Sequence, residues 1–182
     1  MSRDTRTRLL EAAMSEFIEA GYAGTDTNRI ARRAGFAPQT FYRWFKDKPT
    51  VLAEVLAVWD EAETAMWQAV IQDEHLTATE LAQSCVDNVR PFLIFRLQLR
   101  SVLQQAPEIA ARRAEGRQRL MQALVPLVAA RLDRESLGSL IVQIDQLSEA
   151  IARGDLADMG LNGSAAHEAL ARLITALRGA SD

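Results

Sequence analysis

The sequence of 182 residues predicts an all-α protein with about nine helices. Three observations support this class. Apolar residues recur at spacings of three and four along almost the whole chain, strand-like alternation is nearly absent, and glycine or proline separates the apolar stripes at helical lengths. With 48% hydrophobic and 25% charged residues, the composition is that of a folded globule with a sizeable core.

The first predicted helix carries an apolar stripe and ends at a glycine turn near Gly21. This stripe consists of Leu9, Leu10, Ala13, Phe17 and Ile18. After the turn, a side-chain oxygen of Thr25 or Asp26 can cap a second, short helix, which Gly35 then breaks.

Pro38 suits the first turn of a third helix, where its missing N–H costs nothing, and this helix should run to Trp44 or Phe45. Asp47 can cap a fourth helix, again with a proline in its first turn. Two short helices joined by a tight turn and braced by a longer one have the order of a helix-turn-helix unit, whose second helix enters the DNA major groove.

Beyond the fourth helix, the stripes consist mostly of aliphatic residues. A fifth helix from Thr77 or Thr79 should bend at Pro91, because an interior proline removes a backbone hydrogen bond. Pro107 opens a short sixth helix, and Gly116 separates it from a seventh. Stripes at 137–151 and 170–177, joined by a glycine-containing loop, complete the expected helices.

Charge is distributed unevenly. Residues 1–50 hold nine Lys or Arg against six Asp or Glu, whereas residues 51–182 hold twelve against eighteen. Between Thr27 and Lys48 there are six basic residues and one acidic residue. A basic island on an acidic body indicates a polyanion contacted at one place, and a solvated basic helix face is the alternative reading.

The third predicted helix has the chemistry of a base-reading element. Gln39 and Thr40 lie at its start, where glutamine can bond an adenine edge and threonine can offer a hydroxyl or methyl group. Tyr42, Arg43 and Trp44 follow and can donate to phosphates, which orients a protein on DNA without reading sequence. Lys48, at the start of the next helix, can do the same.

From Arg8 to Leu52 the chain resembles the DNA-binding domain of the TetR family of bacterial transcriptional regulators. The matching residues are Gly21-Tyr22, Thr25, Ile30-Ala31, Ala34-Gly35-Phe36, the run from Thr40 to Lys48, and Leu52. This resemblance implies a DNA-binding domain over residues 1–48 and a helical effector-binding and dimerisation domain over 49–182. Ala37 departs from the family's usual Ser or Thr and loses a cap, and Pro49 replaces a usual acidic or polar residue.

Carried over position by position, the resemblance implies DNA contacts at Thr25, Thr27, Pro38, Gln39, Thr40, Tyr42, Arg43, Trp44 and Lys48. The expected partner is double-stranded DNA with a pseudopalindromic operator, because a homodimer presents two helix-turn-helix units related by a twofold axis.

An effector pocket is expected among the aromatic residues of the body. We expect it to be lined by Trp59, Met66, Trp67, Asn88, Phe92, Phe95, Gln98, Met121 and Val125, although core packing is the alternative for each. The two C-terminal stripes are wide enough to pair with their copies in a four-helix dimer interface. Its residues would be Leu137, Leu140, Ile141, Ile144, Leu147, Ile151, Leu170, Leu173, Ile174 and Leu177.

Other classes find little support. No apolar run is long enough for a bilayer span, no secretory signal opens the chain, and the single cysteine, Cys85, cannot form an intramolecular disulfide, so a cytoplasmic protein is expected. His75 and His167 lie far apart, and neither metal-ligand spacing nor a phosphate-binding glycine loop is present, so we expect no metal, cofactor or enzymatic activity.

The sequence therefore predicts a sequence-specific DNA-binding regulator, in the first place a repressor released by a small-molecule effector. An activator or a ligand-independent regulator is the alternative within this class. A helical small-molecule binding protein or enzyme with a vestigial helix-turn-helix is the alternative from another class.

Overall fold

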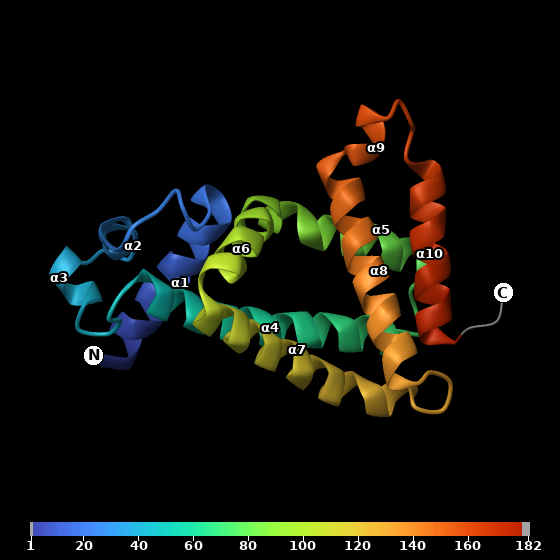
Figure 1. The fold of residues 1–182 in the computed structure, drawn as a ribbon, viewed down its shortest axis with the longest axis horizontal. Coiled ribbons are helices and arrows are strands. Elements are labelled where there is room, and N and C mark those ends of the chain that lie inside the picture. Colours follow the sequence, from blue (N-terminus) through green and yellow to red (C-terminus); the bar gives the residue numbers. More distant parts are fainter. Residues whose placement is uncertain (1, 180–182) are drawn as a thin grey trace. The chain divides into compact units, whose positions relative to one another are not determined.

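The computed structural model describes residues 2–179, which form ten α-helices and one 3₁₀ turn and contain no strand (Figure 1). The all-α class is confirmed. The elements are α1 (Ser2–Ala20), α2 (Thr27–Arg33), α3 (Pro38–Phe41), α4 (Lys48–Gln72), α5 (Ala78–Val89), the 3₁₀ turn η1 (Arg90–Phe92), α6 (Leu93–Gln105), α7 (Pro107–Val128), α8 (Arg134–Arg153), α9 (Asp155–Asp158) and α10 (Ser164–Arg178). None of the described helices is both long and apolar enough to cross a membrane.

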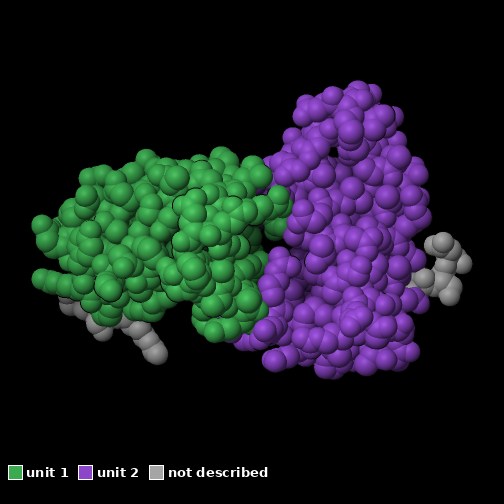
Figure 2. Space-filling view, in the orientation of Figure 1, with its two compact units in different colours: residues 1–61, 94–116 green, residues 62–93, 117–182 purple. Residues whose placement is uncertain are grey.

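The chain divides into two compact units (Figure 2). Unit 1 consists of residues 1–61 and 94–116, and unit 2 consists of residues 62–93 and 117–182. Helices α4 and α7 each contribute their first part to unit 1 and the remainder to unit 2. Unit 1 contains the whole segment expected to bind DNA and adds α6 to it. A domain boundary at residue 48 stays a prediction.

The core of unit 1 fixes α2 and α3 against α1 and α4. Phe17 of α1, Ile30 of α2, Phe41 of α3 and Leu52 of α4 are all fully buried in one apolar cluster. Burial of a side chain of this size stabilises a fold by about 1.5–3 kcal/mol. A four-residue helix such as α3 has too few internal hydrogen bonds to persist alone, so the buried Phe41 anchors it.

Polar side chains begin several helices as the sequence predicts. The Oδ1 atoms of Asp26 and Asp47 accept hydrogen bonds from backbone N–H groups three residues later, at 2.8 and 2.9 Å. Thr77 forms a reciprocal capping box with Glu80 at the start of α5. Ala37 provides no side-chain cap for α3, as its methyl group requires.

Unit 2 is built around α5, α8 and α10, which contact one another closely (Figure 1). Their buried faces share one apolar cluster, to which the later turns of α4 and α7 also contribute. The sequence predicts one helix bent at Pro91; in the structure the helix is divided at this proline, because α5 ends at Val89 and a 3₁₀ turn precedes α6. Arg178 of α10 donates a hydrogen bond to the Leu76 carbonyl at 2.9 Å, which fixes the end of α10 to the loop before α5.

Three details of the sequence prediction were wrong. The third helix ends at Phe41, and the chain continues in turns in which the Trp44 N–H donates to the Phe41 carbonyl at 2.9 Å, the spacing of a 3₁₀ helix. The loop after Gly154 contains the short α9. Gly116 does not separate two helices but lies within α7.

Gly116 lies against a buried ion pair of unit 1, and this contact explains why the position holds a glycine. A Cβ atom there would overlap the carboxylate of Asp60, which is buried on α4 and ion-paired with Arg113 of α7. Gly116 therefore provides room for this ion pair, and its helix-breaking tendency is overcome by the packing of α7.

Gly116→Ala should destabilise the protein although alanine favours helix. Overpacking against Asp60 is expected to lower the free energy of unfolding by about 1–3 kcal/mol, measured by urea denaturation. Gly138→Ala is the matched control, because a Cβ at this position in α8 meets only the Met121 methyl group at 3.7 Å. It should stabilise by about 0.4–1 kcal/mol, and equal stabilisation by both variants would contradict the proposed role of Gly116.

Candidate nucleic-acid interface

Helices α2 and α3 are joined by a tight turn that depends on one glycine. Gly35 has a φ of 79°, in the left-handed region that residues with a Cβ atom seldom adopt. The Gly35 N–H donates to the Arg32 carbonyl at 3.0 Å, and the Phe36 N–H donates to the Ala31 carbonyl at 2.9 Å. These bonds end α2 and turn the chain towards α3 within a few residues.

One face of α3 and the turn after it is exposed. Phe41 is fully buried, whereas Gln39 and Arg43 are exposed and Tyr42 is 57% exposed. Pro38 and Thr40 are half-buried. The side chains with hydrogen-bonding and cationic groups are thus directed outwards while the aromatic anchor holds the helix, which is the arrangement needed to reach base edges and phosphates.

A hydroxyl pair connects the two short helices. The Thr27 Oγ1 atom at the start of α2 lies 2.8 Å from the Tyr42 Oη atom after α3, a hydrogen-bonding distance in which either group can donate. Trp44 is half-buried against the apolar cluster of unit 1. The predicted contacts Thr27 and Tyr42 therefore lie together on one surface.

Thr25 has a different environment. Its side chain is buried, and Oγ1 donates to the Glu16 carboxylate of α1 at 2.8 Å. The hydroxyl is therefore engaged within the protein, and a DNA contact through it stays a prediction.

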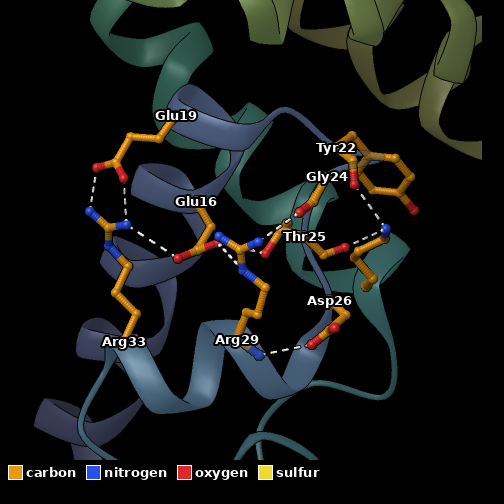
Figure 3. Close-up of polar contacts among 9 residues, drawn as sticks. Glu16, Glu19, Tyr22, Gly24, Thr25, Asp26, Arg29 and Arg33 are labelled. Atoms are coloured by element: carbon orange, nitrogen blue, oxygen red, sulfur yellow. Dashed lines mark hydrogen bonds and ion pairs between the residues drawn. The ribbon is translucent and has the colours of Figure 1, made fainter.

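The six basic residues from Arg29 to Lys48 fall into different groups. Two of them turn back to α1: Arg29 Nε lies 3.1 Å from a carboxylate oxygen of Glu16, and Arg33 Nη1 lies 3.2 Å from the other (Figure 3). Arg33 also pairs with Glu19, and these hydrogen bonds raise the pKa of Arg33 and lower that of Glu19.

Three other cations face solvent. Within the described residues 4–179, the side chains of Arg32, Arg43 and Lys46 are exposed and form no hydrogen bond or ion pair. Fewer positive charges of this region therefore face solvent than the six basic residues counted in the sequence. Sequence reasoning missed the compensation by Glu16 and Glu19, whose spacing of three on the first helix was the available signal.

Lys48 holds the turn between α1 and α2. Its Nζ atom donates to the carbonyls of Tyr22 at 2.9 Å and Thr25 at 3.0 Å and lies 4.1 Å from the centre of the Tyr22 ring. Partial burial lowers the pKa of Lys48, and nearby Asp26 opposes that effect. An ammonium group has three N–H donors, so one remains for a phosphate.

Gln98 of α6 holds the same turn from another helix. Its Oε1 atom accepts a hydrogen bond from the Ala23 N–H at 2.7 Å. Gly21, with a φ of 72°, leaves room for the amide of Gln98, since a Cβ atom there would overlap it. The turn from Gly21 to Thr25 is therefore bound by one side chain from α4 and one from α6.

The residues predicted to line an effector pocket occur in both units. In unit 1, the rings of Trp59 and Phe95 pack with centroids 4.7 Å apart, and Gln98 binds the turn described above. In unit 2, Trp67 is fully buried, and its indole N–H has no hydrogen-bond partner. The other predicted residues of unit 2 are the half-buried Met66, Phe92, Met121 and Val125 and the exposed Asn88. A shared pocket stays a prediction.

The predicted dimer residues are mostly covered by their own chain. The core of unit 2 buries seven of the ten: Leu137, Ile141, Ile144, Ile151, Leu170, Ile174 and Leu177. These side chains are occupied in internal packing, so the broad stripes that suggested an interface have a role within one protomer. Leu140, Leu147 and Leu173 are half-buried and retain surface for a partner.

The described part of the chain contains neither a metal-binding cluster of side chains nor an activated thiol. No group of three or more His, Cys, Asp or Glu side chains is placed there to hold a metal ion. Burial, followed by the charge of Asp145, raises the pKa of Cys85 to about 11. Its thiol therefore stays protonated near neutral pH and is a poor nucleophile.

Comparison with known proteins places the helix-turn-helix in a family. Residues 9–55 match the family model described as bacterial regulatory proteins, tetR family. This segment belongs to the TetR family. One relative is the uncharacterized HTH-type transcriptional regulator YdgC of Bacillus subtilis, 26% identical over 93 residues. The match covers 50% of this chain and 48% of YdgC, so the chain spans about half the length of this curated relative.

Solved structures share the fold over nearly the full chain. A TetR-family transcriptional regulator from Streptomyces coelicolor, SCO4454, has a TM-score of 0.68 at 21% identity and covers 99% of this chain and 97% of its own. The transcriptional regulator FadR from Bacillus subtilis, in complex with stearoyl-CoA, has a TM-score of 0.57 at 18% identity and covers 92% and 96%. The fold of TetR-family regulators thus extends beyond the matched segment.

Lys48→Met should weaken the fold, because methionine keeps an apolar stem but removes the ammonium group that binds two carbonyls. We expect a loss of about 1–2 kcal/mol in the free energy of unfolding, reduced from a fully buried value by partial solvent screening. Urea denaturation measures it, with the exposed Lys46→Met as control. An equal effect of both substitutions would show that Lys48 has no structural role.

Proposed function

We propose that this chain is a sequence-specific DNA-binding transcriptional regulator that binds an operator as a homodimer and is released from it by a small-molecule effector. The observation that carries the proposal is the exposed polar face of α3, with Gln39 and Arg43, on a helix-turn-helix that matches the TetR family. A buried aromatic anchor behind an exposed polar and cationic face suits insertion into a major groove.

Each exposed side chain has a chemically distinct part in this proposal. Gln39 reads a base edge, for which its amide offers both a donor and an acceptor. Arg43 and the hydroxyl pair of Thr27 and Tyr42 bind phosphates, together with the remaining N–H of Lys48. Pro38, Thr40 and Trp44 fix the approach of the helix, and Thr25 contributes through the backbone of the turn it ends.

A homodimer follows from the small size of the reading element. One short helix contacts few base pairs, so specificity requires two copies separated by a multiple of about 34 Å along the DNA. The half-buried Leu140 and Leu147 of α8 and Leu173 of α10 support pairing of these helices with their copies, because a partner would complete their burial.

The effector is proposed to bind in the helical body. FadR, which shares the fold, binds stearoyl-CoA, and this supports a ligand site in the corresponding part of the present chain. The buried indole N–H of Trp67 supports it further, because a buried donor without a partner is unfavourable until a polar group binds it.

Release of DNA then requires communication between body and helix-turn-helix. Gln98 of α6 and Lys48 of α4 both bind the turn that leads into α2. A ligand that favours another arrangement of these helices would shift the population away from the DNA-binding arrangement, and DNA would oppose the ligand by the same factor.

Arg43→Ala and Gln39→Ala should affect DNA binding differently. Arg43→Ala is expected to weaken binding to operator and random DNA alike and to flatten the dependence of log affinity on log salt by about 0.9 for each phosphate that is no longer neutralised. Gln39→Ala should weaken only the operator, by about 1–3 kcal/mol per bidentate pair, and relax the preference at one base pair. Fluorescence anisotropy between about 50 and 200 mM salt measures both.

The operator for these titrations comes from selection on a randomised oligonucleotide pool at low ionic strength. Absence of any enriched site would refute the proposed function. Identical losses of affinity for both variants on both DNAs would refute the assigned roles of Gln39 and Arg43.

Effector binding should change the emission of Trp67. In a Trp44→Phe/Trp59→Phe variant, Trp67 is the remaining tryptophan of the chain, and a ligand that accepts a hydrogen bond from its indole should shift the spectrum. The ligands are screened by their ability to dissociate the operator complex. If a ligand that dissociates the complex leaves this emission unchanged, Trp67 does not line the site.

A further inference from the structure

A buried carboxylate lies beneath α2. Glu16 of α1 is 5% exposed and accepts three polar contacts, from Thr25 Oγ1 at 2.8 Å, Arg29 Nε at 3.1 Å and Arg33 Nη1 at 3.2 Å (Figure 3). Glu16 thus draws two of the three arginines of α2 towards α1, although α2 is part of the helix-turn-helix.

Both arginines have further acceptors on the same side. Arg29 Nη1 donates to the Gly24 carbonyl at 3.2 Å, and Arg33 Nη1 donates to Glu19 at 2.7 Å (Figure 3). The two guanidinium groups are therefore held by several atoms of α1 and of the turn after it. Arg32 lies between them in sequence, and its side chain is exposed.

The energetics of this cluster are asymmetric. The Glu16 side chain is 7% exposed, whereas those of Arg29 and Arg33 are 48% and 35% exposed. The arginines could be solvated without Glu16, but a buried carboxylate deprived of both cations would keep only the Thr25 hydroxyl. A DNA phosphate that competes for these arginines would have to overcome that desolvation cost.

We propose that Glu16 is a specificity-determining residue: by holding Arg29 and Arg33 against α1, it limits the number of DNA phosphates that α2 can bind. The inference rests on the proposed function. Phosphate contacts supply nearly all the affinity for non-specific DNA and a smaller share of that for an operator. Withholding two cations per protomer therefore lowers non-specific binding more than operator binding.

Substitution of an arginine tests whether Arg29 binds Glu16 and not a DNA phosphate in the unchanged protein. Arg29→Ala in the otherwise unchanged protein should leave the salt dependence of DNA binding unaltered, because Arg29 contacts Glu16 and not phosphate. Arg43→Ala is the reference for a residue that binds phosphate and should flatten the slope by about 0.9 for each phosphate it neutralises in the unchanged protein. If Arg29→Ala flattens the slope as Arg43→Ala does, Arg29 already binds phosphate and the inference is wrong.

Glu16→Gln tests whether removing the carboxylate frees an arginine of α2 to bind DNA phosphate. The amide can still accept from Thr25 but forms no ion pair, whereas Arg33 keeps its pair with Glu19. Arg29 is therefore the arginine released, and the slope should steepen by about 0.9 for each phosphate that it binds. Affinity for random DNA should rise more than affinity for the operator, and adding Arg29→Ala should reverse part of the change.

Glu11→Gln is the matched control, since it removes the same charge from an exposed position of α1. An effect of Glu16→Gln no larger than that of Glu11→Gln would overturn the inference. Circular dichroism establishes that each variant is folded. Should Glu16→Gln fail to fold, Arg29→Ala and Arg33→Ala in the wild-type background still decide the matter.

Failure of the proposed function can be distinguished from failure of the role proposed for Glu16. If no operator is selected and Arg43→Ala changes nothing, then the interface itself is misassigned. If Arg43→Ala weakens binding, but Glu16→Gln acts as an ordinary surface-charge change and Arg29→Ala flattens the salt dependence, only the role of Glu16 is refuted.

Discussion

One buried carboxylate, that of Glu16, holds α2 against α1 together with the apolar core of unit 1. Glu16 is almost inaccessible to solvent, so its charge must be compensated by groups of the protein, which are the Thr25 hydroxyl in the turn before α2 and two arginines of α2. The cluster adds directional hydrogen bonds and ion pairs to the apolar contact between α1 and α2. Compensation of the Glu16 charge also decides which cations remain on the surface.

The turn between α1 and α2 gathers the contacts of several helices. Glu16 binds its last residue, Lys48 of α4 binds two of its carbonyls, and Gln98 of α6 binds one of its N–H groups. Backbone groups in a turn otherwise lack helical partners, so side chains from elsewhere can satisfy them. A five-residue turn thus becomes the place where displacement of α4 or α6 would reach α2.

Packing between helices explains a second set of residues whose role cannot be read from the sequence alone. Gly116 marks the position where α7 approaches the carboxylate of Asp60, and in sequence it had the appearance of a helix break. Seven of the ten leucines and isoleucines of α8 and α10 that the sequence assigned to a dimer interface lie in the core of unit 2, and the interface itself stays a prediction. In both cases the local sequence pattern identifies an apolar or small residue, but only the tertiary contacts of that residue show its structural role.

The amino-acid sequence alone determined the all-helical class, the cap at Asp47, and the helix-turn-helix with its outward Gln39 and Arg43, and it narrowed the cap of α2 to Thr25 or Asp26. These features follow from interactions within a few residues, namely periodicity, capping and turn chemistry, which a linear pattern preserves. Only the tertiary structure decided which charges of the basic window face outwards, because Glu16 and Arg29 meet through the packing of two helices. It also decided that Lys48 and Gln98 hold the same turn, since partners separated by many residues are brought together by burial of the core and not by local spacing.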